Sequence, residues 1–479
     1  MPEAHRIQAG LAYWMNKVIE ERANLSAGFA PDPVHDLRVA LRRCRSLADG
    51  ITGIDPHPAW RQVKKIARPL FSGLGNLRDI HVLSEWVARL SSGDSPVRSA
   101  LLAHADSEET RLKEMALGTV QQFDEKQWLS CCEILSRRVK LLRLDSLIFR
   151  HLALERWNEA HQLHRQALRN RSHVAFHRLR IGLKKFRYTV ENFLPSLCES
   201  WEGDLKYLQD VLGEIHDLDM LWATALRIGA FQDEASRSHW RATIEEQRSQ
   251  RLSEYRNQMV GRHSQWSFWR AALPQGKELH EAVLLRLKTW AAFLDPDFAH
   301  ARHVSRLALQ LYDGLAKNGR NHQQQFDRTR LLLQAAALMH DVGRARSRKN
   351  HHKGSYRLIR KLAPPFGWKL RELQQAAAIA RYHRGALPRP GQSSYQTVPR
   401  SAKRQTVFLA GILRLADALD QKHDGRIHEL EVEKTGDFFT VWACGPSGKP
   451  QDLQYVAAAR HLLESVCGRP IWVRLRAMS

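Results

Sequence analysis

The sequence predicts a mainly α-helical protein, with two related helical bundles followed by an all-helical domain that ends in a small β-sheet. Three observations predict this fold class. Apolar residues recur at three- and four-residue steps through residues 1–262 and again from about 278 to 425, as in helices that bury one face. An internal repeat runs through the first stretch. Beyond residue 425 the pattern changes to the alternation typical of strands.

The overall charge narrows the classes of function. The chain has 479 residues, with 74 Lys and Arg against 50 Asp and Glu, which gives a net charge of +24. A field of this size attracts polyanions, namely nucleic acid, inorganic polyphosphate or an anionic membrane surface. A basic surface that serves only solubility is the alternative. The charge therefore indicates an anionic partner without identifying it.

The cysteines and the apolar runs indicate the compartment. Six cysteines are scattered without a C-x-x-C pair, which argues against a zinc framework and a disulfide scaffold and favours reduced thiols. No apolar run approaches the length of a membrane span, and the N-terminus lacks the apolar core of a signal peptide. We therefore expect a cytoplasmic protein that does not bind membranes.

The internal repeat consists of two motifs that recur in the same order. The segment VHDLRVALRRCRS (34–46) matches FHRLRIGLKKFRY (176–188) position for position. After each copy comes a second pair, LGNLRDIHVL (74–83) and LGEIHDLDML (212–221). Two ordered matches at similar offsets predict a duplicated helical unit, with repeats at about 5–145 and 146–262.

Each copy of the first motif predicts a helix with one basic face. In the first copy, one face carries His35, Arg38, Arg42 and Arg45. The opposite face carries Leu37, Leu41, Cys44 and Ala48. In the second copy, the equivalent basic positions are His177, Arg180, Lys184 and Arg187, opposite Leu179, Leu183 and Phe186. We call these two basic faces the basic stripes.

A charged helix face is usually only solvated, but the recurrence of the same positions in both copies favours an anion-binding site. Neither stripe contains a carboxylate that would neutralise it, so each row of cations repels itself. Arginine binds phosphate through two parallel hydrogen bonds, and a protonated histidine adds charge. Two stripes that face each other would form a basic trough for a long, regularly charged polyanion.

The duplicated H-x-x-R-x-x-x-[RK]-[RK]-x-R motif, each copy followed by L-G-x-x-x-D, resembles the CHAD (conserved histidine α-helical) domain over residues 1–262. The resemblance implies two four-helix bundles around a basic cavity that binds inorganic polyphosphate. It implies that the binding residues are His35, Arg38, Arg42, Arg43, Arg45, His177, Arg180, Lys184, Lys185 and Arg187, with Arg68 and Lys206 as additions. Asp79 and Asp217 would cap or orient, because a carboxylate repels phosphate.

The rest of the chain is divided by a break in the helical pattern. Residues 263–277 form the expected linker, and a domain over 278–479 follows it. IHELEVEKTGDFFTVWA (427–443) alternates around a T-G-D turn, which predicts a β-hairpin. A helix is expected over 454–468 and a last short strand in PIWVRL.

Histidines and aspartates in this last domain form an ordered set with the chemistry of a metal site. In chain order they are His303, the adjacent His340 and Asp341, His351 and His352, His383, Asp417 and Asp420. Imidazoles and carboxylates are ligands for Zn, Mn and Fe. A single histidine is more often structural, but the ordered set favours a metal centre, and His340 and Asp341 follow a strongly apolar helix.

The stretches AAALMHDVGRA, HHKGSYRLIR, IARYHRG and LRLADALD resemble the HD phosphohydrolases, and more closely the C-terminal domain of the exopolyphosphatase/guanosine pentaphosphate phosphatase (Ppx/GppA) family. The resemblance implies one or two divalent ions, which would be Mn, Fe, Zn or Mg. One ion would be bound by His303, His340, Asp341 and Asp417, and a second by Asp341, His352 and His383. Asp341 would be catalytic, with Arg344, Lys353 and Arg384 binding substrate phosphate. Lys422 and Arg426 would extend this basic rim or would simply be solvated.

Two functions follow from these observations. The first is a polyphosphate-binding protein that carries a metal-dependent phosphohydrolase acting on polyphosphate or a phosphorylated nucleotide. The alternative is a non-catalytic adaptor at polyphosphate granules, in which both domains bind polyphosphate. A specific nucleic-acid binder is disfavoured, because the stripes lack interleaved aromatic residues that would stack on bases. The sequence leaves the oligomeric state open, a homodimer included.

Overall fold

The structure is a computed structural model that describes residues 10–25, 29–91, 93, 95–316, 323–445 and 450–476. The chain divides into two compact units: Met1–Thr52 with His57–Pro274, and Gly53–Pro56 with Gln275–Ser479. We call them unit 1 and unit 2 and describe each by itself. The predicted start of the first repeat, at about residue 5, lies outside the described residues.

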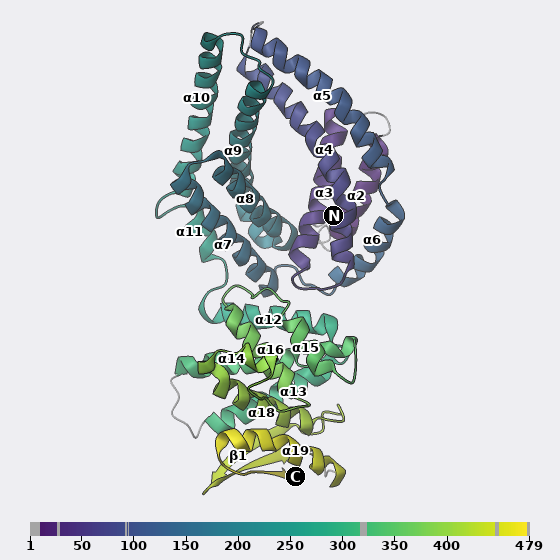
Figure 1. Ribbon diagram of the computed structural model, residues 1–479, viewed down its shortest axis with the longest axis vertical. Helices are drawn as coiled ribbons and strands as arrows, with labels where there is room; N and C mark the ends of the chain where they lie inside the picture. The colour runs from purple at the N-terminus through teal and green to yellow at the C-terminus, as the bar shows by residue number, and fades with distance from the viewer. Residues whose placement is uncertain are drawn as a thin grey trace. The chain divides into compact units, whose positions relative to one another are not determined.

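Unit 1 is helical throughout its described residues (Figure 1). Its first half contains α2 (Gly10–Asn24), α3 (Pro31–Ile51), α4 (Ala59–Leu90), α5 (Pro96–Gln121) and α6 (Glu125–Val139). Its second half contains α7 (Leu147–Asn170), α8 (His173–Phe193), α9 (Pro195–Arg227), α10 (Glu234–Met259) and α11 (Gln265–Ala271). The two first-motif copies lie on α3 and α8, and the two L-G-x-x-x-D copies lie on α4 and α9.

Both stripe helices form for local reasons and bury their apolar faces. α3 begins with Pro31 in its first turn, where a missing N–H costs nothing. The Ser172 hydroxyl caps α8 by accepting a hydrogen bond from the Ala175 N–H at 3.2 Å. The predicted apolar faces are in the core, and Leu37, Leu41, Leu179 and Leu183 are all 0% exposed. The stripes are thereby turned away from the core.

The two halves of unit 1 pack against each other at two levels. α3 contacts α8, and α4 contacts α9. At the far ends of the long helices, α4, α5, α9 and α10 share one apolar cluster that includes Trp86, Leu101, Leu221 and Trp240. Figure 1 shows this meeting of the α4–α5 and α9–α10 pairs in blue and teal. The shared cluster fixes the spacing between the two copies of the repeat.

The predicted linker, residues 263–277, contains the seven-residue helix α11. Its Trp266 and Trp269 are buried, with 2% and 0% of their surface exposed. The Trp157 indole N–H donates a hydrogen bond to the Trp266 carbonyl at 3.1 Å. The helical pattern is broken in the sequence because α11 is too short to show periodicity. In the structure its two tryptophans pack it against the rest of unit 1.

Unit 2 is a helical domain with a terminal sheet (Figure 1). Its helices are α12 (Gly276–Leu294), α13 (Phe298–Ala316), α14 (Gln323–Met339), η2 (Val342–Ala345), α15 (His351–Ile359), α16 (Leu370–Tyr382), α17 (Ser393–Gln396), η3 (Arg400–Ala402), α18 (Lys403–Leu419) and α19 (Pro450–Cys467). Its strands are β1 (Glu429–Thr435), β2 (Phe438–Cys444) and β3 (Ile471–Arg476).

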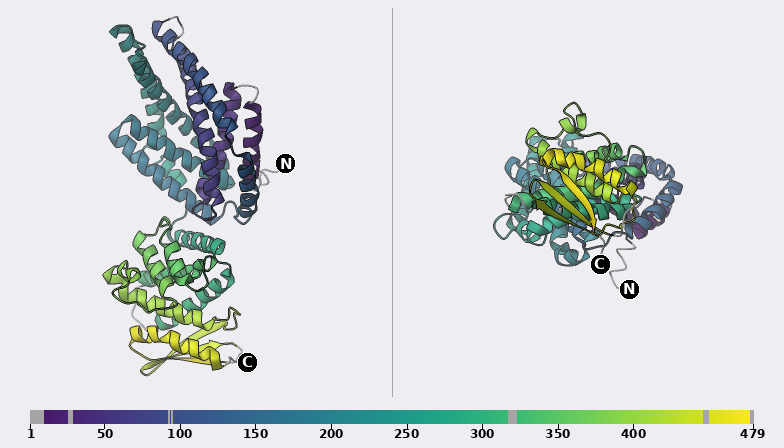
Figure 2. Two further views of the ribbon diagram at one scale, coloured as in Figure 1. Left: turned by 45° about the vertical axis from the view of Figure 1, so that its right-hand side comes forward. Right: turned by 90° about the horizontal axis from the view of Figure 1, so that it is seen from below.

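The strand order is β1-β2-β3, with β1 antiparallel and β3 parallel to β2. The predicted hairpin is present, and Gly436 adopts φ +59° in its turn. The inner sheet face, including Leu430, Val441 and Ile471, joins the core of the unit. Figure 2 shows the sheet beside α19 at the yellow end of the chain. The mainly helical fold with a small C-terminal sheet is confirmed.

None of the described helices combines the length and the apolar character that crossing a membrane requires.

Candidate functional site

A cavity of about 700 Å³ lies between α3 and α8 in unit 1. We call it the basic cleft. Its cationic lining residues are Arg38, Arg42, Arg45, Arg156, Lys184 and Lys185. One carboxylate, Asp49, also lines it, and that group forms an ion pair with Lys64. The cleft brings together residues of both stripes and adds Arg156 of α7, which the sequence motifs did not indicate.

The innermost cations of the cleft are poorly solvated and repel one another. Burial, together with Arg180 and Arg42, lowers the pKa of Lys184 to about 7. Burial and the neighbouring Arg42 lower the pKa of Arg38 to about 10. Arg42 donates a hydrogen bond to the Tyr188 hydroxyl at 3.0 Å, and no ion pair joins Arg42 or Lys184 to a carboxylate among the described residues. An anion in the cleft would offset this repulsion.

The L-G-x-x-x-D motif seats the first arginine of each stripe. The Arg38 guanidinium donates to the Phe71 carbonyl at 3.0 Å, and a Cβ on Gly75 would lie only 2.9 Å from its Nη1. In the second copy, a Cβ on Gly213 would lie 4.0 Å from Arg180 Nε, an ordinary contact distance. The glycine therefore leaves room for the arginine in the first copy, whereas a Cβ would fit in the second.

The two motif aspartates lie inside this cluster of cations. Burial raises the pKa of Asp217 to about 6, although Arg180 and Lys184 oppose the shift. Burial likewise raises the pKa of Asp79 against the effect of Arg38. The Arg180 Nε is buried and makes no hydrogen bond. The aspartates thus act electrostatically on the seated arginines, and neither of them lines the cleft.

The stripe histidines lie outside the cleft lining. Burial and nearby Arg78 lower the pKa of His35, and burial and Arg180 lower that of His177. His177 Nδ1 is 3.3 Å from Nδ1 of His216, whose pKa burial lowers to about 4. Burial and the neighbouring cations therefore disfavour the charged form of these imidazoles in the free protein, whereas the sequence predicted that protonated histidines add charge.

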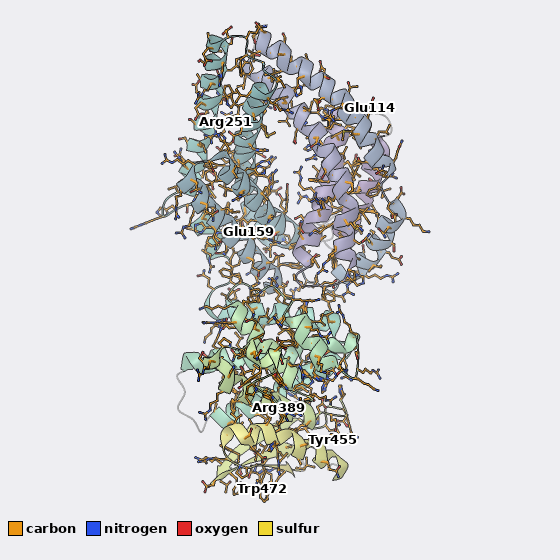
Figure 3. All side chains as sticks on the ribbon, in the orientation of Figure 1. Glu114, Glu159, Arg251, Arg389, Tyr455 and Trp472 are labelled. Atoms are coloured by element: carbon orange, nitrogen blue, oxygen red, sulfur yellow. The ribbon has the colours of Figure 1, made fainter. Side chains whose placement is uncertain are left out.

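Two further predicted binding residues share one buried carboxylate within the fold. Arg43 and Arg187 both form ion pairs with Glu191, whose side chain is only 5% exposed. Glu191 lies on α8 and reaches Arg43 because α3 packs beside it. Lys185 lines the cleft but also pairs with Glu159, labelled in Figure 3, at 2.8 Å. The structure thus shows which cations of the two stripes form ion pairs with carboxylates and which do not. The motif alone does not contain this information.

The remaining predicted cations are Arg45, Arg68 and Lys206. Arg45 lines the cleft, with its guanidinium 4.3 Å from the centre of the Phe71 ring. Burial lowers the pKa of Arg45, Asp49 opposes this shift, and Arg68, which is exposed on α4, makes a smaller lowering contribution. Lys206 is exposed on α9 and does not line the cleft.

Replacing Arg43 by Gln should reduce stability rather than binding. The change leaves the buried Glu191 with one cation instead of two, so we expect the free energy of unfolding to fall by about 1–3 kcal/mol. Replacing its neighbour Arg42 by Gln should do the reverse, weakening polyphosphate binding with little effect on unfolding. Chemical denaturation and a binding titration on both variants measure the difference. Equal loss of binding in the two variants would contradict the distinction.

The lowered pKa of Lys184 predicts a pH dependence of binding. In the free protein the ammonium loses its proton near pH 7. A bound phosphate would raise this pKa, so binding takes up a proton and affinity should fall as the pH rises from about 6 to about 8. Lys184→Arg should flatten this dependence, since a guanidinium stays charged throughout. Calorimetric titrations at several pH values measure it, and an unchanged profile in Lys184→Arg would exclude Lys184 as its source.

Buried histidines and aspartates of unit 2 form two groups that could hold a metal ion. They are His300, His340 and Asp417, and His340, Asp341 and His383. Within each group the candidate ligand atoms lie within 4.8 Å of one another. α13 supplies His300 and α18 supplies Asp417, whereas the other three residues follow the ends of α14 and α16. Shared His340 makes the two groups one continuous cluster, which we call the His/Asp centre.

The rings of the centre are oriented by hydrogen bonds on their outer nitrogens. His340 Nδ1 lies 2.7 Å from the Ala337 carbonyl, and His383 Nδ1 lies 2.6 Å from the Ala380 carbonyl. His300 Nδ1 lies 2.7 Å from Oδ2 of Asp420. At His340 and His383, an Nδ1–H that donates in this way leaves the Nε2 lone pair free to bind a metal ion. At His300, Nε2 also contacts Asp417, and the two carboxylates raise the pKa of the ring to about 9 against the effect of burial, so a metal ion would have to displace the Nε2 proton.

The structure brings His300 into the centre, whereas the sequence analysis proposed His303. His300 Nε2 lies 3.3 Å from Asp417 Oδ1. His303 lies one turn further along α13, where Arg306 donates a hydrogen bond to its Nδ1 at 3.0 Å. Positions three apart on a helix share a side, so the spacing alone did not separate the two histidines.

A similar shift by one residue occurs at the start of α15. His351 Nε2 lies 3.2 Å from Asp341 Oδ1 and 3.1 Å from His383 Nε2. The predicted ligand His352 lies outside both groups, beside Gly385, and its pKa falls to about 4 through burial and Arg381. α15 begins at His351, so the first residue of the helix faces the centre and the second turns away.

Within the part of the chain that the structure describes, two buried atoms of the His/Asp centre lack a hydrogen-bond partner, as expected of ligands to a metal ion. Among the described residues, His340 Nε2 and Asp341 Oδ1 are buried without a hydrogen bond. His340 Nε2 lies 3.5 Å from Asp417 Oδ1 and 3.8 Å from Asp341 Oδ1, which is too far for a normal hydrogen bond. Asp341 Oδ1 lies 3.2 Å from His351 Nε2 without forming a hydrogen bond to it. Buried polar atoms without a partner are costly, and a cation among them would satisfy both.

Charges in the centre favour ionised carboxylates. Burial alone would raise the pKa of Asp341, but the imidazoles of His340, His383 and His351 bring it well below its usual range. Burial opposes the same shift at Asp417, where the neighbouring His300 and His340 lower the pKa. Metal ligands must be deprotonated, so these carboxylates are in the form that binding requires.

Arginines hold the outer oxygens of both carboxylates. Arg344 donates to Asp341 Oδ2 at 3.0 Å, and Arg384 Nε lies 3.6 Å from Asp417 Oδ2. The inner Oδ1 atoms face the histidines. Both arginines were predicted to bind phosphate, and the structure places them against ligands as well. Lys353 is exposed and forms no ion pair among the described residues, and Lys422 and Arg426 lie outside both groups.

Two residues near the centre were not identified from the sequence. Asp295, at the end of α12, is buried with Oδ2 free of hydrogen bonds, and burial raises its pKa with a contribution from Asp341. His423 stacks on His300 at 3.6 Å between ring centres and hydrogen-bonds Asp297 at 2.6 Å. His423 has φ +58°, a strained conformation for a residue other than glycine.

Comparisons with known proteins were made for the whole chain. The CHAD domain model matches residues 10–226, and the model of Ppx/GppA phosphatase, domain III, matches residues 287–442. The crystal structure of the CHAD domain from the plant Ricinus communis is 20% identical, covers 58% of this chain and 91% of its own, and has a TM-score of 0.37. No curated protein sequence matches. The chain therefore carries a CHAD domain at residues 10–226 and a Ppx/GppA phosphatase domain III at residues 287–442.

Proposed function

We propose that this protein binds inorganic polyphosphate in the basic cleft and hydrolyses phosphoanhydride bonds at the His/Asp centre. The two domains together support a polyphosphate-related function. The observation that carries the binding proposal is the set of cleft cations that lack a carboxylate partner, Arg42 and Lys184 above all. The substrate of the centre is polyphosphate or a phosphorylated nucleotide, which share the same bond.

The shape and charge of the cleft favour a polymer of phosphates over other anions. Its cations come from three helices and lie along a cavity of about 700 Å³. Nothing in the lining reads a particular sequence of bases, because the cleft aromatics Phe71 and Tyr188 already contact arginines. A featureless chain of phosphates can satisfy such a surface in many registers, with affinity set by charge.

For hydrolysis we propose one divalent ion, Mn, Fe, Zn or Mg, held by His300, His340, Asp341, His383 and Asp417, with His351 as a further donor. Such an ion lowers the pKa of a bound water toward neutrality and so supplies hydroxide. Arg344 and Arg384 hold the carboxylates in place, and their side chains, 24% and 46% exposed, also reach solvent. We propose that both bind phosphoryl oxygens of the substrate and stabilise the charge that develops on them.

One observation favours the adaptor as a second candidate. Arg344 donates a hydrogen bond to the outer oxygen of Asp341, and Arg384 forms an ion pair with the outer oxygen of Asp417. His300 lies between Asp417 and Asp420. These contacts are also those of a centre that serves structure alone. In that case the protein would bind polyphosphate, and collect at polyphosphate granules, without cutting it.

Phosphate release by the full chain distinguishes the two candidates. The chain is loaded with each metal in turn and offered long-chain polyphosphate and pyrophosphate, at low and high salt. If the cleft holds the polymer that the centre cuts, kcat/KM for the long chain should fall at high salt and in Arg42→Glu/Lys184→Glu. Turnover of pyrophosphate should change much less. Absence of release with every metal and both substrates, while binding persists, would leave the adaptor.

A further inference from the structure

Unit 2 contains a concave site whose lining includes none of the residues of the His/Asp centre. A cavity of about 350 Å³ lies between α12, α13 and α14. We call it the α13 pocket. Its volume falls within the range of small-ligand sites. Four cations line it, namely Lys288, Arg302, Arg306 and Arg330.

The charge of the α13 pocket is largely uncompensated. The one carboxylate in its lining, Asp313, binds the Arg330 guanidinium, with Nε–Oδ1 at 3.0 Å and Nη2–Oδ2 at 3.2 Å. Among the described residues, no ion pair joins Lys288, Arg302 or Arg306 to a carboxylate. Arg302 and Arg306 are four residues apart on one helix, where like charges repel. The pocket therefore gathers three positive charges that have no carboxylate partner in the described part of the chain, and one of them, Arg306, donates a hydrogen bond to His303.

The pocket and the His/Asp centre use different sides of the same helix. At about 100° per residue, Arg302 and Arg306 lie roughly 120–160° around α13 from His300. Ser305, between them in the pocket wall, is 4% exposed and belongs to the same side. A ligand in the pocket is thus separated from the centre by the width of a helix, about 10 Å. A phosphoryl group bound in the pocket is therefore not the group that reacts at the centre.

We propose that the α13 pocket is a binding site for a small phosphoanion. Two guanidinium groups one turn apart can each form paired hydrogen bonds with phosphate oxygens, and Lys288 adds a third charge from α12. Ser305 and Gln334 offer neutral polar groups in the same lining. The ligand is free phosphate, pyrophosphate or the end of a polyphosphate chain, which present the same chemistry. This site does not depend on the proposed function of the cleft or of the centre.

Arginine footprinting on the full chain tests the pocket at residue level. Phenylglyoxal modifies accessible guanidinium groups, and peptide mass spectrometry gives a rate for each. Pyrophosphate should slow the modification of Arg302 and Arg306 at least about fivefold, with no change at the exposed Arg237 and Arg241 of α10, which share the same spacing. Long-chain polyphosphate and inorganic phosphate are tested in separate arms, and the arm that protects at the lowest concentration assigns the source.

Calorimetric titration of variants with pyrophosphate tests the pocket independently of the footprinting. In calorimetric titration with pyrophosphate, Arg302→Gln/Arg306→Gln should lose one class of sites, with Kd raised at least about tenfold. Arg237→Gln/Arg241→Gln should match the wild type. Unprotected Arg302 and Arg306 at saturating phosphoanion would overturn the proposal, and so would equal protection by a dicarboxylate such as succinate. Neither result would bear on the proposals for the cleft or the centre. Their arginines, such as Arg42 and Arg344, are followed as separate peptides in the footprinting experiment.

Discussion

Replacing Arg42 and Lys184 together by glutamate is expected to weaken the binding of long-chain polyphosphate to the full chain by at least about 100-fold. Each change removes a cation that lacks a carboxylate partner and places an anion in the basic cleft. Neither side chain contributes to the apolar core, so helical content should be unchanged. The measurement is a titration at fixed salt, repeated over a salt series, with circular dichroism as a check on folding.

The matched control is Arg237→Glu/Arg241→Glu on α10. Both arginines are exposed and lie outside the cleft, and the change in net charge is the same. This control should lose affinity only slightly, through the general field of the protein. The cleft variant should also show a shallower salt dependence, because fewer counterions are displaced on binding. Equal weakening in both variants would mean that net charge, rather than the cleft, binds the polymer.

Replacing Asp417 by Asn is expected to raise the Kd for the bound metal ion by at least about 100-fold. Asp417 supplies an inner oxygen that lies 3.3 Å from His300 Nε2 and 3.5 Å from His340 Nε2. An amide is nearly the same size but carries no charge, so the change removes a ligand without opening a cavity. Metal content after dialysis, together with the rise in Tm on adding metal, measures the loss.

Two further variants make this a graded series. Asp420→Asn affects a residue that only positions His300, so it should weaken metal binding by about 10–100-fold. Asp424→Asn alters an exposed carboxylate that pairs with Arg426, and it should have no effect. If all three variants retain metal like the wild type, or if the wild type binds none, the centre is structural and the adaptor is the function.

Local patterns in the sequence were sufficient to predict the helices that carry both sites. The apolar faces of α3 and α8 and the hairpin around Gly436 follow from periodicity and turn chemistry, and the structure contains them. The parallel pairing of β3 with β2 was not predicted, because it depends on where α19 places the chain. Helix α11 was not predicted, because it is too short to show helical periodicity. The burial of its two tryptophans stabilises it.

The sites themselves depended on contacts between distant segments. Arg43 and Arg42 are neighbours in one motif, yet Glu191 neutralises only Arg43, a difference that requires α3 to pack beside α8. The pairing of Arg187 with Glu191 was readable, because the two lie four residues apart on one helix. The choice of His300 over His303 requires knowing which side of α13 faces Asp417 on α18. The order of the motifs predicted that histidines and aspartates of unit 2 form a cluster. Which histidines belong to it depends on how the helices pack.

Competitive acylation of Lys184 is the most direct test of the central claim, that polyphosphate occupies the basic cleft. Its pKa of about 7 makes Lys184 unusually reactive near neutral pH, and it lines the cavity. The exposed Lys361 of unit 2 serves as the internal reference. The account predicts that saturating polyphosphate suppresses labelling of Lys184 at least about tenfold, by covering the amine and restoring its proton, while Lys361 is labelled as before. Undiminished labelling of Lys184 in protein shown to be saturated with polyphosphate would contradict it.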